Sequence, residues 1–191
     1  MSDDNTGAAR AASRLLRPLL QRVRRDICWI KPADGYPRRT DEPLTKAKIA
    51  KHLNGGPYFG AAHILPGEST TRVGLLDLDS HKGEVPWATM IETADMLCSA
   101  LTDRGLAPVV FRSTGGSGLH VYVLWDAPQD AYSVRAVLRE ALSDCGLTPG
   151  TAGVIEGEVE VFPKQDHVPD GKFGNMAILP LAGQSALLEP M

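Results

Sequence analysis

The chain has 191 residues, a length that suits one domain or a domain with a small appendage. Its composition, 43% hydrophobic and 23% charged, is typical of a soluble globular protein and excludes a disordered one. The apolar runs are short, and the first residues lack the basic and apolar segments of a secretory signal, so we expect no membrane span and no export. Three widely separated cysteines form no zinc or disulfide pattern, which favours a reducing cytoplasm.

The net charge of −3 conceals an uneven distribution. Residues 1–72 hold 13 Lys and Arg against 7 Asp and Glu, a balance of +6, whereas residues 73–191 hold 7 against 16, a balance of −9. A basic first third joined to an acidic remainder suits a protein that binds a polyanion with one part and metal ions with the other.

The first 44 residues are expected to form a basic helix and a loop. Apolar residues recur at three- and four-residue steps from Ala8 to about Trp29, which predicts an amphipathic helix that Pro18 breaks or bends. Residues 31–43, with three prolines, predict a loop. The other sides of the helix carry arginines that either bind phosphates or simply face solvent: Arg10, Arg14, Arg17, Arg22, Arg24 and Arg25.

The remaining residues, 45–191, are expected to form the main domain. Helices are predicted over residues 45–53, 86–104 and 130–145, with Thr45 as an N-cap. Strands are predicted over residues 58–65, 72–78, 107–113, 119–125, 158–163 and 175–181. The order of these elements favours an α+β fold, with a mostly antiparallel sheet backed by helices.

Two aspartates end the most apolar of these strands. Side chains two residues apart share one face of a strand, so Asp77 and Asp79 should project together while Leu76 and Leu78 enter the core. Adjacent carboxylates repel each other unless a cation lies between them, and Mg2+ or Mn2+ prefers such oxygen ligands. The alternative is a strand that runs out into a solvated turn.

The second motif is a glycine-rich turn between two strands. Ser113 precedes the turn of residues 114–118, and His120 follows it on the same strand face as Tyr122. Such a turn lets backbone N–H groups approach a phosphate, and Arg112 and His120 would add cationic contacts. The alternative is a flexible hairpin loop and a histidine with a local partner.

The third motif is a strand with alternating glutamates. Glu156, Glu158 and Glu160 should share one face, and Lys164 just beyond the strand could reach a phosphate. Three like charges on one face destabilise a strand unless a cation lies opposite them. The alternative is an edge strand whose charges prevent aggregation.

Together and in this order, the three motifs resemble those of the archaeo-eukaryotic primase superfamily. Its members carry an Asp-x-Asp/Glu strand, a small-x-His strand and a third acidic strand. The stretches at residues 112–113, 162–165 and 174–181 are most similar to primase-polymerase domains of phage, plasmid and defence-system replication proteins. The resemblance covers about residues 45–183 and implies that residues 45–191 are the catalytic domain.

The resemblance also implies the fold and the site. The fold would pair an N-terminal α/β unit with an RRM-like unit, and the active site would lie in the cleft between them. Asp77, Asp79 and Glu160 would bind two Mg2+ or Mn2+ ions, with Glu158 still an alternative to Glu160. The residues implied to bind the incoming nucleotide are Arg112, Ser113, Gly116, Ser117, Gly118, His120, Lys164 and Asn175.

The implied function is template-directed DNA primase and DNA polymerase activity by a two-metal mechanism. Expected partners are a single-stranded DNA template with its primer, NTPs or dNTPs and a helicase, in the cytoplasm of a phage-infected or plasmid-bearing bacterium. Two alternatives stay open: a catalytically degenerate nucleic-acid-binding module, and a glycosyltransferase that uses Asp-x-Asp as its Mn2+ site.

Overall fold

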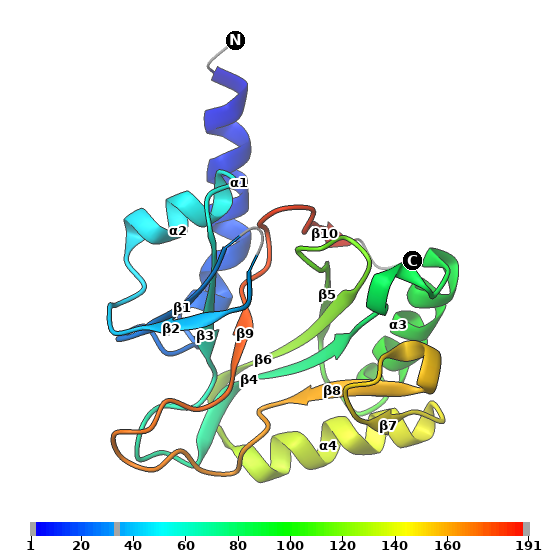
Figure 1. The fold of residues 1–191 in the computed structure, drawn as a ribbon. Helices are drawn as coiled ribbons and strands as arrows, with labels where there is room; N and C mark the ends of the chain where they lie inside the picture. Colours follow the sequence, from blue (N-terminus) through cyan, green and yellow to red (C-terminus); the bar gives the residue numbers. More distant parts are fainter. Residues whose placement is uncertain (1–2, 33–34, 189–191) are drawn as a thin grey trace.

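The computed structural model describes residues 3–32 and 35–188, and for residues 3–10 and 82 only the backbone. Two sheets, each with its own pair of helices, make up the molecule (Figure 1). Within the described residues, no helix is both long and apolar enough to cross a membrane. The helices are α1 (Asp3–Leu20), α2 (Lys46–Leu53), α3 (Trp87–Thr102) and α4 (Ala131–Asp144), with short 3-10 turns η1 (His81–Gly83) and η2 (Val154–Glu156).

The first sheet has four antiparallel strands in the order β2-β1-β3-β9. They are β2 (Arg38–Thr40), β1 (Cys28–Lys31), β3 (Tyr58–Ala62) and β9 (Met176–Ile178). Helices α1 and α2 lie beside this sheet (Figure 1). As expected, α2 begins after Thr45, whose hydroxyl accepts a hydrogen bond from the Lys48 backbone N–H at 3.2 Å.

The prediction of a helix up to Trp29 and a loop over residues 31–43 was wrong, because strands β1 and β2 occupy much of this stretch. The helix ends two residues after Pro18, whose carbonyl accepts a hydrogen bond from the Arg22 guanidinium at 2.7 Å. This contact satisfies a carbonyl that a longer helix would have bonded internally. The apolar residues that follow then enter β1, which lies between β2 and β3.

The second sheet has six strands in the order β10-β5-β6-β4-β8-β7. They are β10 (Leu187–Leu188), β5 (Pro108–Arg112), β6 (Leu119–Asp130), β4 (Thr70–Leu78), β8 (Glu158–Phe162) and β7 (Thr148–Pro149). All neighbours are antiparallel except β7 and β8, so the expected α+β class with a mostly antiparallel sheet is confirmed.

The two faces of the second sheet are covered by different parts of the chain. On one face, α3 and α4 pack on apolar side chains that include Leu76, Leu78, Leu119, Val121 and Val161. On the other face, Leu75 and its neighbours share a core with the first sheet and α1. The centre of this sheet is therefore buried on both faces, which explains why β4 reads as a nearly continuous apolar run.

Candidate active site

The functional side chains gather where β4 ends between β6 and β8. In the strand register, Asp77 is directly opposite His120 on β6 and directly opposite Glu160 on β8. Residues paired in this way point to the same face of a sheet. Asp77, His120 and Glu160 therefore form one row across three neighbouring strands, hereafter the acidic row.

Asp77 and the leucines on either side of it divide as the alternation predicted. Leu76 and Leu78 are fully buried in the core beneath α3 and α4. The side chains of Asp77 and Glu160 keep 19% and 20% of their surface exposed. The acidic row is thus accessible at the surface while its supporting strands are fixed in a core, the arrangement that holds charged side chains in a defined position.

Asp77 is in close contact with His120, whose side chain is buried. His120 Nε2 lies 3.3 Å from Asp77 Oδ1, without the geometry of a well-aligned hydrogen bond. Burial acts to lower the pKa of His120, but the charges of Asp77 and Asp79 raise it overall. Among the described residues, Asp77 Oδ1 is buried without a hydrogen-bond donor, a condition that costs about 1–3 kcal/mol for a polar group.

Asp79 adds a second negative charge close to the row. Its pKa is raised, first by burial and then by the charge of Asp77, whereas His81 and His120 act to lower it. Glu160 is compensated by Lys164, whose Nζ lies 3.0 Å from Glu160 Oε2. The site therefore holds more carboxylates than cationic groups that could neutralise them.

A divalent metal ion fits this donor set chemically. As positioned, no three His, Cys, Asp or Glu side chains in the described part of the chain surround a single metal position. However, a buried carboxylate oxygen without a donor and a raised carboxyl pKa are both relieved by a bound cation. Mg2+ and Mn2+ prefer carboxylate oxygens, so Asp77, Asp79 and Glu160 are the residues that would hold such an ion.

The three glutamates of the third motif separate in the structure. Glu160 belongs to the acidic row, but Glu158 Oε2 accepts a hydrogen bond from the Ala152 backbone N–H at 2.8 Å. Glu156 lies in η2, before β8 begins, so the prediction that it shares the strand face was wrong. The Glu158 carboxylate thus fastens the loop that carries Ala152, and only Glu160 lies directly opposite Asp77.

The glycine-rich turn closes against the end of β4. The Ser113 N–H donates to the Gly118 carbonyl at 2.8 Å, and the Gly118 N–H donates to Ser113 Oγ at 3.1 Å. A Cβ on Gly118 would lie 2.7 Å from the Leu78 carbonyl oxygen and 3.4 Å from Asp79 Oδ1. Only glycine allows this approach, which brings Ser113 beside Asp79. Within the turn, Gly116 has a positive φ of 85° and precedes Ser117.

One of the expected nucleotide-binding residues, Arg112, lies on the face opposite the acidic row, and another, Asn175, is held by a contact of its own. Arg112 pairs with Leu119 and so belongs to the helix-covered face, where its Nε donates to the Gly116 carbonyl at 2.6 Å. Its guanidinium also stacks over the Trp87 ring at 4.5 Å. The exposed Asn175 is held at its backbone N–H by Gln165 Oε1, at 2.9 Å. The structure thus brings Ser113, the turn and Lys164 to the row, but not the Arg112 guanidinium.

His81 is a residue whose role the sequence reasoning missed. Its Nε2 lies 2.9 Å from the Thr151 carbonyl, and the Asp79 carbonyl accepts a hydrogen bond from the Val154 N–H at 3.0 Å. These contacts tie the loop before β8 to the end of β4. The signal in the sequence was a titratable side chain two residues after Asp79.

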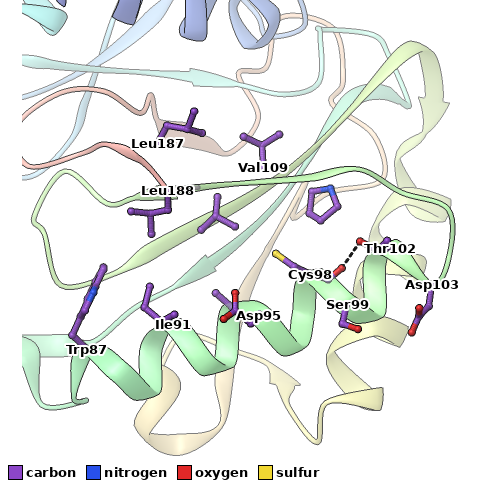
Figure 2. Close-up of a pocket in the computed structure, with 13 residues that line it drawn as sticks. Trp87, Ile91, Asp95, Cys98, Ser99, Thr102, Asp103, Val109, Leu187 and Leu188 are labelled. Atoms are coloured by element: carbon purple, nitrogen blue, oxygen red, sulfur yellow. Dashed lines mark hydrogen bonds between the residues drawn. The ribbon is translucent and has the colours of Figure 1, made fainter. Parts of the chain in front are cut away.

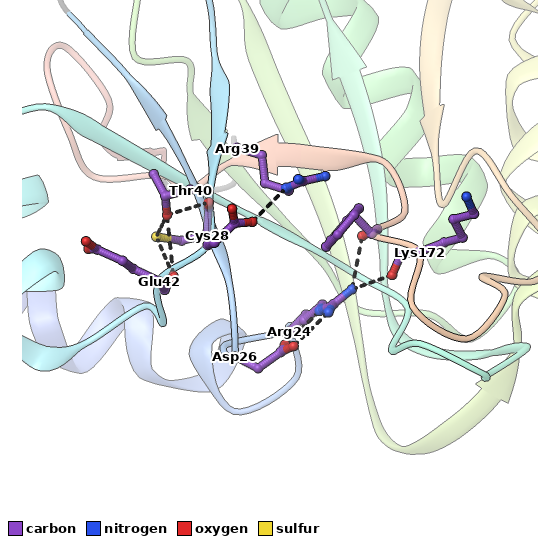
Figure 3. A network of polar contacts seen from close by, with 9 residues as sticks. Arg24, Asp26, Cys28, Arg39, Thr40, Glu42 and Lys172 are labelled. Atoms are coloured by element: carbon purple, nitrogen blue, oxygen red, sulfur yellow. Dashed lines mark hydrogen bonds and ion pairs between the residues drawn. The ribbon is translucent and has the colours of Figure 1, made fainter.

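The arginines after α1 serve the fold rather than a free basic face. Arg24 is buried, pairs with Asp26 at 2.7 Å and donates to the Lys172 carbonyl at 2.9 Å (Figure 3). Arg22 donates to the Trp125 carbonyl at 2.8 Å, and Arg25 to the Leu44 carbonyl at 3.1 Å. On α1 itself Arg14 and Arg17 are exposed, and the Arg10 side chain lies outside the described part.

Two cavities border the second sheet. The larger, of about 800 Å³, is a mainly apolar groove between α3 and strands β5 and β10, with Trp87, Ile91 and Leu188 on its walls (Figure 2). It contains no residue of the acidic row. The smaller, of about 240 Å³, is lined by charged residues and reaches the row at Glu160. The larger cavity is therefore not the charged one. The charged side chains favour the smaller cavity as part of the candidate site.

Comparisons with known proteins give one family and one fold. The fold is similar to that of the polymerase domain of Mycobacterium tuberculosis ligase D, solved in complex with DNA, with a TM-score of 0.59 and 16% sequence identity. The similarity covers 93% of this chain and 76% of that one. A comparison with curated protein sequences finds no match. The family model of the archaeo-eukaryotic primase domain of TOTE conflict systems matches residues 19–188, and the chain therefore belongs to this primase family.

Proposed function

We propose that this chain is a template-directed DNA primase and DNA polymerase, which transfers a nucleotide from an NTP or dNTP to a 3′-hydroxyl. The observation that carries the proposal is the acidic row, in which Asp77 lies between His120 and Glu160 on neighbouring strands. Membership of a primase family and the fold of a polymerase domain support the same class of reaction.

In this proposal, Asp77, Asp79 and Glu160 hold two divalent ions, Mg2+ or Mn2+. When bound, these ions supply Lewis-acid activation of the hydroxyl nucleophile and neutralise charge on the pyrophosphate leaving group. The protein itself holds the carboxylates in place, through strand pairing and through the core beneath Leu76 and Leu78. Preorganised charge of this kind needs no rearrangement during the reaction.

The residues around the row would bind the triphosphate. His120, with its raised pKa, supplies a cation or a hydrogen-bond donor, and Lys164 supplies a second cation. Ser113 and Ser117 would add hydroxyl donors. Gly116 and Gly118, whose N–H groups donate to the Ser113 carbonyl and to Ser113 Oγ, would give the turn the shape that presents these donors. Arg112 would support the turn through the Gly116 carbonyl, and Asn175 would act only at the outer margin of the site.

Single-stranded DNA with a primer is the proposed macromolecular partner. The structurally similar ligase D domain was solved with DNA, and the first third of this chain carries a balance of +6. Exposed arginines on α1, Arg14 and Arg17, are the proposed phosphate contacts. We further expect action in a bacterial cytoplasm beside a helicase, on the basis of the resemblance.

Primer extension tests the proposal most directly. A labelled primer on a single-stranded template would be incubated with dNTPs or NTPs and Mg2+ or Mn2+, for the wild type and for Asp77→Ala/Asp79→Ala. We expect extension by the wild type alone. DNA binding by both proteins with no synthesis under any condition would instead support the binding module, and turnover of a UDP-sugar without template would support the glycosyltransferase.

A further inference from the structure

The smaller cavity lies at the edge of β8, beside the acidic row. Strand β7 pairs with β8 only at Glu158 and Val159, so the pairing of this edge stops one residue before Glu160. The cavity of about 240 Å³ lies between α4, the loop after β7 and the end of β8. Its lining residues are Arg135, Arg139, Pro149, Gly150, Thr151, Glu160, Val161 and Lys164.

The lining carries more positive than negative charge. Arg135, Arg139 and Lys164 contribute three cations, against the single carboxylate of Glu160. Asp166, which does not line the cavity, pairs with Arg135 Nη2, and Lys164 pairs with Glu160 at 3.0 Å. Arg139 forms no ion pair within the described residues. The Glu158 carboxylate lies against Gly150 and accepts a hydrogen bond from the Ala152 N–H, so the cation left to attract an anion is Arg139.

Arg135 is the exceptional member of this group. It is only 8% exposed, although it lies on a surface helix, and its Nη1 is buried with no hydrogen-bond acceptor in the described part. A guanidinium in a protein is always charged, and leaving one of its donors unpaired costs at least about 1–3 kcal/mol. Arg135 also lines the cavity, so an anion placed there would lie beside its guanidinium charge.

The size of the cavity and the type of donors point to a phosphate. Guanidinium groups bind phosphate oxygens through paired N–H donors, a geometry that lysine lacks. A volume of about 240 Å³ is below the range of roughly 300–1,000 Å³ typical of sites for drug-sized ligands, so it suits a small anion better than a whole nucleotide. The adjacent backbone of Gly150 and Thr151 is close enough to line the same space.

We propose that this cavity is a phosphate-binding subsite, with Arg135 as its buried anchor and Arg139 and Lys164 at its rim. The phosphate belongs either to a pyrophosphate or polyphosphate group or to the backbone of a nucleic-acid strand. Both sources are present where nucleotides are joined, so this part of the proposal rests on the proposed function. Binding of an anion to the subsite does not depend on nucleotide synthesis and can be measured without it.

Equilibrium binding without divalent metal tests the subsite. Sodium pyrophosphate and a 12-nucleotide single-stranded oligonucleotide would be titrated separately, by calorimetry in EDTA, into the wild type, Arg139→Gln and Arg135→Lys. Arg139→Gln removes an exposed charge and should fold normally. Arg135→Lys keeps the charge but removes the paired donors. Arg104→Gln is the matched control, because Arg104 lies outside the cavity and pairs with Asp144.

We expect each cavity variant to weaken the relevant anion about tenfold, while Arg104→Gln leaves binding unchanged. Weaker pyrophosphate binding with unchanged oligonucleotide binding would identify a polyphosphate subsite, and the reverse a backbone subsite. Unchanged binding of both anions by Arg139→Gln and by a folded Arg135→Lys would overturn the proposal. Asp77→Asn should bind the anion as the wild type does, so a failure of polymerase activity and a failure of the subsite are distinguishable.

Discussion

Two rows of side chains lie one pleat apart on the same face of the same three strands, and they have opposite characters. In one row Leu75 is directly opposite Tyr122 and Phe162, and all three are at most 5% exposed. In the acidic row Asp77 is directly opposite His120 and Glu160, and the two carboxylates stay partly exposed. The His120 and Tyr122 rings join the two rows in a T-shaped contact, with centroids 6.1 Å apart.

The difference arises from what covers each row. The first sheet and α1 pack on the row of Leu75, within one shared core, and the acidic row lies beyond that core. Strand alternation alone assigns both rows to one face, whereas the position of the covering sheet decides which row is buried. The apolar row supplies stability and the acidic row supplies chemistry, so substitutions should separate the two effects.

The largest expected effect is the loss of activity in Asp77→Asn. The substitution keeps the shape of the side chain but removes the charge that would hold a divalent ion, so primer extension should fall about a thousandfold or more. The substitution relieves the repulsion that raises the pKa of Asp79 but also removes the charge beside His120 Nε2, so the two effects on stability oppose each other and the melting temperature should change little.

Asp126→Asn is the control for this experiment, because the Asp126 side chain on β6 is fully exposed and pairs with Arg22 at 2.6 Å, far from the acidic row in the strand register. It should extend primers at the wild-type rate. Full activity in Asp77→Asn would contradict the assignment of the acidic row as the catalytic centre.

Leu75→Ala should have the opposite profile, with a large loss of stability. Removing a fully buried leucine between Tyr122 and Phe162 leaves a cavity and should lower the free energy of unfolding by about 2–5 kcal/mol. Chemical denaturation monitored by circular dichroism would measure this loss. Below its melting temperature the variant should still extend primers. If it were folded but inactive, the two rows would be coupled more tightly than this comparison implies.

Periodicity in the sequence was enough to predict which face of the sheet a side chain occupies. It did not predict which residue lies opposite that side chain on the neighbouring strand. The alternation around Leu76 and Leu78 correctly placed Asp77 opposite the helix-covered core, and His120 with Tyr122 on the same face. Glu158 and Glu160 are equivalent under a two-residue period. Only the pairing of β8 with β4 distinguishes them, and that pairing depends on contacts between distant parts of the chain.

The short strands and the orientation of Arg112 escaped prediction for related reasons. Residues 28–30 continue an apolar spacing that suits a helix, yet they form β1 once the chain has turned after α1. Leu187–Leu188 is too short to stand out as a strand without β5 beside it. Arg112 is adjacent to Phe111, which pairs with His120, so a shift of one residue along β5 decides which face the guanidinium occupies.

Asp79→Asn should produce a smaller change, in stability and in its response to metal. The pKa of Asp79 is raised in the folded chain, by burial and then by Asp77, so the folded state holds this proton over a pH range in which the unfolded state has released it. Wild-type stability should therefore fall as pH rises through that range. Removing the charge should raise the melting temperature at pH 7 by a few degrees, about 2–4 °C per kcal/mol for a chain of this size.

Two conditions check the origin of that rise. The advantage of Asp79→Asn should disappear below about pH 4, where the carboxyl is protonated in both states. Added Mn2+ should raise the melting temperature of the wild type more than that of the variant, because ligand binding to the folded state stabilises it. Equal responses to Mn2+ would argue against Asp79 as a ligand.

Glu158→Gln should have the smallest effect, in contrast to Glu160→Gln two residues further along β8. The Glu158 carboxylate accepts a hydrogen bond from the Ala152 N–H, and a glutamine oxygen can still accept it, so stability should fall by less than about 1 kcal/mol. Primer extension should remain within about twofold of the wild type, because Glu158 lies beside the loop rather than beside Asp77.

Glu160→Gln keeps the same length but removes the charge opposite Asp77, so it should lose most of its activity while remaining folded. A reversed result, with Glu158→Gln inactive and Glu160→Gln active, would place the third acid outside the acidic row and imply a shift of β8 during catalysis.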